Sequence, residues 1–190
     1  WGLGLGIIID GNLYYGKSGF SGELGHFCMF ENEVLCHCGK KGCLETEASG
    51  SAFHRILMER YQEGSNTILA GKLDSGEEIS LGDLLEAVRK EDVLCIDILE
   101  KMGVNLGKGI AGLMNIFNPE LVILGGTLSL AGEYISLPIK SAIRKYSLNL
   151  VNQDTEIKIS KLGERAGSFG ACLLSRSKLL GKIVTKFKKK

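Results

Sequence analysis

The sequence lacks both a large excess of charge of one sign and a long hydrophobic run. Its 190 residues carry a formal net charge of +1, which excludes a protein that holds DNA by charge over its whole surface. Basic residues are dispersed except in the last five, 186–190, and such a short run is typical of a solvated tail. No apolar stretch is long enough to cross a bilayer, and no signal peptide is recognisable. We therefore expect a cytoplasmic protein that makes no membrane contact.

Cysteines are few, and half of the six lie within eight residues. In the cytoplasm such thiols stay reduced, which favours metal binding over disulfides. A histidine ten positions upstream completes a tetrahedral set of the kind that holds zinc. The four expected ligands are His26, Cys36, Cys38 and Cys43. His37 and Cys28 are weaker candidates, because a residue between two ligating cysteines usually points away from the metal. The sequence thus predicts a zinc loop over residues 26–43.

Two carboxylates flank this loop. Glu23 precedes His26 by three residues, and Glu45 follows the last cysteine by two. Carboxylates accept hydrogen bonds from hydroxyl groups, and a histidine that binds zinc through one ring nitrogen can donate from the other. Glu23, His26 and Glu45 therefore form a candidate site for a polyol such as a sugar. The alternative is that both glutamates are surface groups, or that they favour the start of a helix near Leu44.

The apolar pattern and the turn signals predict an α/β domain of 190 residues. The expected strands are a hairpin over 5–15, a third strand over 25–30, a buried strand over 121–124 and an edge strand over 156–160. The expected helices are 44–61, one from 83, 96–117, 133–145 and 166–180. A polar, glycine-marked insertion over 64–82 carries no chemistry that the sequence identifies.

Two glycine clusters are candidates for nucleotide contact. Gly2 and Gly4 match a dinucleotide-binding fingerprint only superficially. The segment leads into a strand and not into a helix, so a Rossmann-type site is excluded. Gly125 and Gly126 close the strand 121–124. They fit either a phosphate-contacting turn or an ordinary turn at a strand end.

Several stretches of the chain match one known pattern. The run from Gly19 to His26 has the sequence Gly-Phe-Ser-Gly-Glu-Leu-Gly-His, and Gly42-Cys43-Leu44-Glu45 closes the cysteine loop. Further along lie Asn-Pro-Glu-Leu-Val-Ile-Leu-Gly-Gly over 118–126 and Gly-Ser-Phe-Gly-Ala over 167–171. Together they resemble the ROK family of bacterial repressors and sugar kinases, most of all its NagC/XylR-type sugar-responsive repressors. The resemblance extends from Gly2 to about Leu174.

The resemblance implies an actin-like ATPase fold with two lobes, each built on a ribonuclease-H-like sheet. Residues 1–190 would form the C-terminal lobe, with a basic tail over 181–190. By the same resemblance the four ligands bind zinc, and Glu23, His26 and Glu45 contact sugar hydroxyls. Kinases of the family carry a catalytic aspartate and an Asp-x-Gly-x-Thr phosphate loop in the N-terminal lobe, and neither is found here. We therefore expect this chain alone to be inactive as a kinase. In addition, Trp1 stands where the family's kinases have threonine.

Three functions follow from these observations. The first is the sugar-sensing effector and oligomerisation domain of a repressor, whose DNA-binding domain would lie upstream. The second is the C-terminal lobe of an ATP-dependent sugar kinase, and ATP is expected as a cofactor only in that case. The third is a zinc-stabilised interaction domain without a ligand. The expected partners are a sugar or sugar phosphate and further copies of the chain, as a homodimer or tetramer in which Gly103, Gly107 and Gly112 allow close helix contacts.

Overall fold

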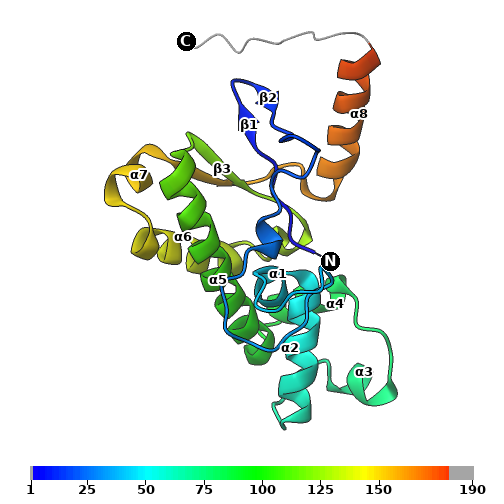
Figure 1. Ribbon diagram of the computed structural model, residues 1–190. Helices are drawn as coiled ribbons and strands as arrows, with labels where there is room; N and C mark the ends of the chain where they lie inside the picture. The colour runs from blue at the N-terminus through cyan, green and yellow to red at the C-terminus, as the bar shows by residue number, and fades with distance from the viewer. Residues whose placement is uncertain (1, 180–190) are drawn as a thin grey trace.

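Helix α5 (Val93–Phe117) is the longest element of the computed structural model, which describes residues 2–179. The Asp92 side chain caps its first turn by accepting from the backbone N–H of Cys95 at 2.8 Å. The helix ends at Asn118, which adopts a left-handed conformation with φ 41° immediately before Pro119. The predicted long helix is therefore confirmed. The other elements are arranged around it (Figure 1).

Helix α6 (Glu133–Tyr146) packs along α5, and glycines allow the two backbones to approach. A Cβ atom on Gly107 would lie 2.6 Å from the carbonyl oxygen of Ile139 and 2.7 Å from the Ala142 side chain. On Gly103 it would lie 2.9 Å from Pro138. The sequence analysis expected these two glycines to allow contacts between subunits. In the structure they allow close packing of two helices within one chain.

We expect Gly107→Ala to destabilise the fold, because the added methyl group meets backbone that cannot move without separating α5 from α6. Overpacking of this kind costs roughly 1–3 kcal/mol. Gly112→Ala is the matched control: nothing lies within 4 Å of a Cβ there, so the higher helix propensity of alanine should stabilise by about 0.5–1 kcal/mol. Denaturant unfolding of both variants measures the difference. Equal stabilities would show that α5 and α6 are not in close contact at Gly107.

The main core lies where α5 meets α2 (Gly50–Gln62), α4 (Leu81–Arg89) and α6. Its largest fully buried side chains include Phe53, Leu57, Leu84, Leu99, Met102, Met114, Ile139 and Ile143. The expected insertion 64–82 contributes to this core through Leu69 and Ile79, and it contains a short helix α3 (Ala70–Ser75). The polar, glycine-marked segment therefore includes one short helix and two residues of the core.

Asp92 holds the start of that segment against α5. Its carboxylate accepts from the Thr67 hydroxyl at 2.8 Å and from the Ile68 N–H at 2.7 Å, in addition to its capping bond. Burial alone would raise the pKa of Asp92, but the N–H groups of Cys95 and Ile68 and the Thr67 hydroxyl outweigh it and leave the pKa lowered. The carboxylate therefore stays ionised and joins two parts of the chain that lie 24 residues apart.

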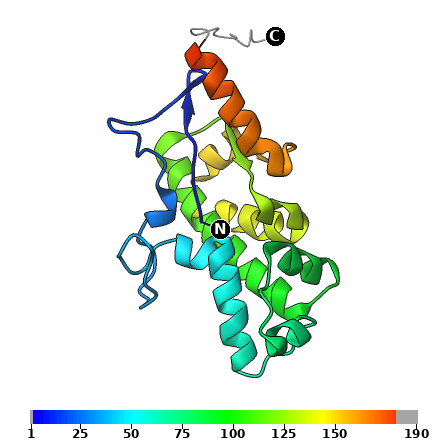
Figure 2. The ribbon, with the colours of Figure 1, turned by 90° about the vertical axis from the view of Figure 1, so that its right-hand side faces the viewer.

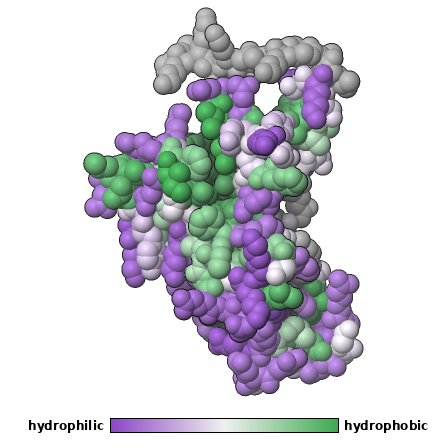
Figure 3. Space-filling view, viewed as in Figure 1, coloured by the Kyte–Doolittle hydropathy of each residue, from purple (hydrophilic) through white to green (hydrophobic). Residues whose placement is uncertain are grey.

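The described residues contain two small sheets. Strands β1 (Ile8–Ile9) and β2 (Asn12–Leu13) form the expected antiparallel hairpin, and β3 (Leu121–Leu124) pairs in parallel with β4 (Glu156–Ile159). The prediction that 121–124 is buried is wrong for one face: Leu121 is 41% and Ile123 61% exposed, while Val122 and Leu124 pack on the core. Hydrophobic side chains are therefore visible around β3 and the nearby α7 (Asn149–Asp154) (Figure 3).

Two further predictions are corrected by the structure. The expected strand 25–30 is replaced by a 3-10 turn η1 (Leu24–His26) and a single bridge at Cys28. The N–H groups of His26 and Phe27 donate to the carbonyls of Glu23 and Leu24 at 3.1 and 3.0 Å, which closes the turn. Just before it, Gly22 has φ +87° and lies so close to the Leu5 carbonyl that no side chain fits. The expected helix 44–61 is split into α1 (Glu45–Ala48) and α2, because Ser49 is extended and caps α2 by accepting from Ala52 N–H.

The β1–β2 hairpin and the C-terminal helix α8 (Ala166–Leu179) lie at one end of the molecule, and α2, α3 and α4 lie at the other (Figures 1 and 2). Trp1 and the basic tail 181–190 lie outside the described residues. Within residues 2–179, no helix is both long and apolar enough to span a membrane.

Candidate metal centre and adjoining carboxylates

The structure brings together the four side chains that the sequence predicts as metal ligands. One ligand atom from each of His26, Cys36, Cys38 and Cys43 lies within 4.8 Å of all the others. His26 Nδ1 is 3.5 Å from the Sγ atom of Cys36, and the Sγ atoms of Cys38 and Cys43 are 3.6 Å apart. His37 and Cys28 do not belong to this group.

These spacings fit a tetrahedral zinc ion. With zinc–sulfur bonds of about 2.3 Å, two sulfur ligands of a tetrahedral site lie roughly 3.8 Å apart. The sulfur–sulfur separation of 3.6 Å is close to that value, and the shorter zinc–nitrogen bond of about 2.0–2.1 Å suits the nitrogen–sulfur separation of 3.5 Å. One histidine and three cysteines are also a common donor set for structural zinc. Both geometry and donor chemistry therefore fit this metal.

The thiols differ in how readily they ionise. The backbone N–H of Lys40 lowers the pKa of Cys38, whereas burial, reinforced by the neighbouring Cys38 and Cys36, raises the pKa of Cys43 to about 12. Because zinc binds the thiolate, the ion must displace the Cys43 proton. Metal binding should therefore release protons and weaken as the pH falls.

Short-range turns hold the cysteines in place. Residues 35 and 41 form one bridge, Cys28 and Cys43 form another, and the Gly39 N–H donates to the Cys36 carbonyl at 2.9 Å. Gly42 adopts φ +76°, and a Cβ atom there would collide with the Phe30 carbonyl. The glycine therefore lets the chain turn back so that Cys43 faces the other two cysteines.

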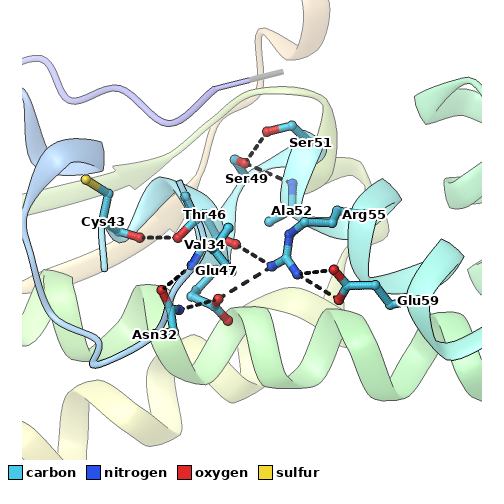
Figure 4. A network of polar contacts seen from close by, with 10 residues as sticks. All are labelled: Asn32, Val34, Cys43, Thr46, Glu47, Ser49, Ser51, Ala52, Arg55 and Glu59. Carbon is cyan, nitrogen blue, oxygen red and sulfur yellow. Dashed lines mark hydrogen bonds and ion pairs between the residues drawn. The ribbon is translucent and has the colours of Figure 1, made fainter. Parts of the chain in front are cut away.

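A polar network fastens the loop to the helices behind it (Figure 4). Asn32 in the loop donates to Glu47 at 2.8 Å, and Arg55 of α2 donates to the Thr46 carbonyl at 2.9 Å. The Thr46 hydroxyl in turn donates to the carbonyl of Cys43 at 2.8 Å. Because the chain breaks its helix between α1 and α2, Arg55 of α2 can contact the Thr46 carbonyl of α1. Sequence reasoning missed these residues. The one signal that could have pointed to Arg55 is its spacing of four residues from Glu59, with which it forms an ion pair.

His26 connects the cysteine cluster with the first carboxylate. While Nδ1 faces Cys36, Nε2 points the other way and lies 3.7 Å from the carboxylate of Glu23. The Glu23 side chain is 58% exposed and the His26 side chain 35%. The ring can therefore bind a metal at one nitrogen and donate to a ligand or to Glu23 at the other.

Both carboxylate oxygens of Glu45 already accept hydrogen bonds. Its Oε1 accepts from the Cys36 thiol at 3.8 Å, and its Oε2 accepts from the Leu3 N–H at 2.9 Å. A Cβ atom on Gly25 would lie 2.5 Å from the Leu3 carbonyl and 3.3 Å from Glu45. Glu45 therefore ties the first residues of the chain to the loop, and Glu23 is the freer of the two carboxylates.

One of the candidate nucleotide-contact glycines, Gly2, lines an open cavity of about 550 Å³. Arg89 of α4 and Thr127, the residue that follows the Gly125–Gly126 turn, line it as well. Gly126 has φ +82°, as the turn requires. The other candidate glycines, Gly4, Gly125 and Gly126, do not line the cavity. The sequence did not identify Arg89, which no local motif marks.

These features define the class of the protein: an α/β domain of the actin-like ATPase fold that carries a histidine and cysteine cluster. The model of the ROK family matches residues 1–178, and the chain therefore belongs to the ROK family. The resemblance inferred from the motifs is confirmed.

Relatives of two functional kinds are similar to the chain. A glucokinase of Halalkalibacterium halodurans is 36% identical over 89% of the chain, and one of Thermotoga maritima is 33% identical over 95%. The xylose repressor of Caldicellulosiruptor bescii is 33% identical over 94% of the chain. The chain spans about half the length of these relatives, namely 52%, 57% and 45%.

Solved structures show the same division. A ROK family transcriptional regulator, a homologue of the E. coli MLC protein, has a TM-score of 0.81 and 37% identity over 93% of this chain and 43% of its own. A ROK glucokinase of Streptomyces griseus, solved with glucose and AMPPNP, has a TM-score of 0.80 and 31% identity over 93% of this chain and 58% of its own. The comparisons thus establish the family without separating repressor from kinase.

Proposed function

We propose that the chain is the zinc-stabilised, sugar-sensing effector domain of a ROK-family transcriptional repressor. The arrangement of His26 carries this proposal, because one ring nitrogen faces the cysteines and the other faces Glu23. A zinc ion held by His26, Cys36, Cys38 and Cys43 would fix the ring, and the ring and Glu23 would bind sugar hydroxyls. Glu45 would add a further acceptor. The protein would act as a homodimer or tetramer and would contact DNA through another domain.

One residue favours the repressor over the kinase. Trp1 precedes Gly2 at a position where the resemblance to the family's kinases implies threonine, and an indole cannot supply the threonine hydroxyl to a phosphate. The C-terminal lobe of an ATP-dependent sugar kinase is the second candidate. It is supported by the 36% identity with a glucokinase and by the cavity between Gly2 and Thr127, which is large enough for a nucleotide.

The two candidates differ in what happens to a bound sugar. Calorimetry on the full-length protein with glucose, xylose and N-acetylglucosamine should detect binding of at least one of them. Addition of ATP and Mg²⁺ to the same sample should then produce no sugar-dependent ADP. Turnover of ATP would assign the protein to the kinases. The absence of sugar binding in the zinc-loaded protein would leave a structural zinc domain, the third function considered above.

Replacing Glu23 by glutamine should weaken sugar binding by about tenfold or more, because a charge-assisted hydrogen bond of roughly 1.5–3 kcal/mol is lost. Zinc content should not change, since Glu23 is not among the clustered ligands. Glu31→Gln is a suitable control because it changes another loop carboxylate outside the candidate site. Calorimetry and elemental analysis on the same preparations test both expectations. Unchanged sugar affinity would remove Glu23 from the site.

A further inference from the structure

Cys28 lies directly opposite one of the three clustered cysteines. It forms an antiparallel bridge with Cys43. The flanking hydrogen bonds run from Met29 N–H to the Gly42 carbonyl and from Leu44 N–H to the Phe27 carbonyl, at 2.8 and 2.9 Å. Neither cysteine bonds to the backbone of the other, so they form a non-hydrogen-bonded pair. In such a pair the Cα atoms are about 4.5 Å apart and the side chains share one face of the ladder.

This register suits a disulfide. Bridged cysteines have Cα separations of roughly 4.4–6.8 Å, and the separation typical of a non-hydrogen-bonded pair, about 4.5 Å, falls within that range. The Cys28 thiol lies over the turn that leads to Cys43: it donates to the Lys41 carbonyl at 3.5 Å, and a Cβ atom on Gly42 would lie 3.2 Å from its sulfur. A rotation about the Cα–Cβ bonds would bring the two sulfurs together without a change of register.

The two thiols also differ in accessibility. Cys28 is exposed and lies outside the metal cluster, whereas Cys43 is buried and belongs to it. Cys38 is exposed as well but is one of the clustered ligands, so Cys28 is the exposed thiol of this loop that a metal leaves uncommitted. A solvent oxidant therefore reaches Cys28 before the buried Cys43. The chain thus pairs an accessible, uncommitted thiol with a metal-binding thiol across two adjacent backbone segments.

We propose that Cys28 and Cys43 form an oxidant-driven disulfide that removes Cys43 from the metal site. A hydroperoxide oxidises the Cys28 thiol to a sulfenic acid. In this step the O–O bond of the hydroperoxide breaks, and its other oxygen leaves as water or as an alcohol. The Cys43 sulfur then attacks the Cys28 sulfur and displaces hydroxide, which leaves as water. The two sulfurs together supply the two electrons that reduce the hydroperoxide. His26, Cys36 and Cys38 remain as three ligands, and zinc is released.

Release of the metal would also disturb the candidate sugar site. Cys43 is followed by Leu44 and Glu45, and His26 would lose the ion that fixes its ring. Oxidation should therefore lower sugar affinity together with zinc content. The metal-release part of this inference rests on the proposed zinc site, whereas the formation of the disulfide rests only on the bridge between Cys28 and Cys43.

The experiment uses zinc-loaded full-length protein treated with hydrogen peroxide. Released zinc is followed with a chromogenic chelator, and peptide mapping identifies the disulfide. We expect a Cys28–Cys43 crosslink, and we expect Cys28→Ser to slow zinc release by at least about fivefold, because the accessible thiol is gone. Cys172→Ser is the matched control, since Cys172 is also exposed but lies on α8 outside the cluster. It should release zinc as fast as the wild type does.

Two results would overturn the proposal. One is mapping that finds only disulfides among Cys36, Cys38 and Cys43. The other is equal release rates in the wild type and in Cys28→Ser. A protein that holds no zinc before oxidation would instead contradict the proposed zinc site, and the crosslink between Cys28 and Cys43 would still be tested by mapping.

Discussion

Replacing Cys38 by alanine is expected to reduce zinc to less than about a tenth of one ion per chain, because three ligands hold the metal far more weakly than four. The midpoint of thermal unfolding should fall with it, since structural zinc binding is part of the folding free energy. Cys38 is exposed, unlike Cys36 and Cys43. The alanine therefore opens no cavity in the core, and the loss of stability reports the loss of the metal.

Elemental analysis and a thermal melt on the same preparation measure both effects. Cys172→Ala is the control, because it removes an exposed thiol that lies outside the cluster. It should keep both the zinc and the melting temperature of the wild type. Treating the wild type with a strong chelator should lower its melting temperature to that of Cys38→Ala. Wild-type protein without stoichiometric zinc would refute the metal site, and a fully loaded Cys38→Ala would remove that residue from it.

The cysteine cluster was predictable from the sequence because it is local. Its members span His26 to Cys43, and glycines at 39 and 42 mark the turns that bring them together. The long helix α5 was predictable for a similar reason, since its apolar residues recur with a helical period and Asn118-Pro119 ends it. In both cases neighbouring residues contain all the information.

The supports of the site were not predictable, because they depend on contacts between distant segments. Glu45 binds the backbone of Leu3 across 42 positions, which no pattern in the sequence indicates. The same holds for Arg89, which reaches the cavity of Gly2 only through the packing of α4. The register that sets Cys28 opposite Cys43 is fixed by the loop as folded.

The errors in the predicted elements have two physical causes. The apolar residues over 25–30 satisfy a strand pattern, but Gly22 and Gly25 must let the first residues of the chain pass, and this forces a turn. The helical pattern over 44–61 is likewise interrupted at Ser49, whose side chain caps the second helix. Here a tertiary contact and a capping bond override the local periodicity.

Two substitutions at His26 distinguish its role in metal binding from its role in sugar binding. His26→Cys offers zinc a fourth thiolate, and four-cysteine sites are common for structural zinc. It also removes the ring nitrogen that lies 3.7 Å from Glu23. We expect zinc to stay near one ion per chain while sugar affinity falls by at least about tenfold, the value of one good hydrogen bond to a charged group. His26→Ala should lose both, because no ligand replaces the ring.

Calorimetry and elemental analysis on both variants distinguish three arrangements. Retained zinc with weakened sugar binding in His26→Cys shows that the ring touches the ligand and does more than hold the metal. Sugar affinity that follows zinc content in both variants, with full affinity in His26→Cys, shows that zinc only shapes the loop and that the ring takes no part. Unchanged affinity in His26→Ala would place the sugar elsewhere. The first result is the expected one, because Nδ1 of His26 faces the cysteines and Nε2 faces Glu23 on the exposed side.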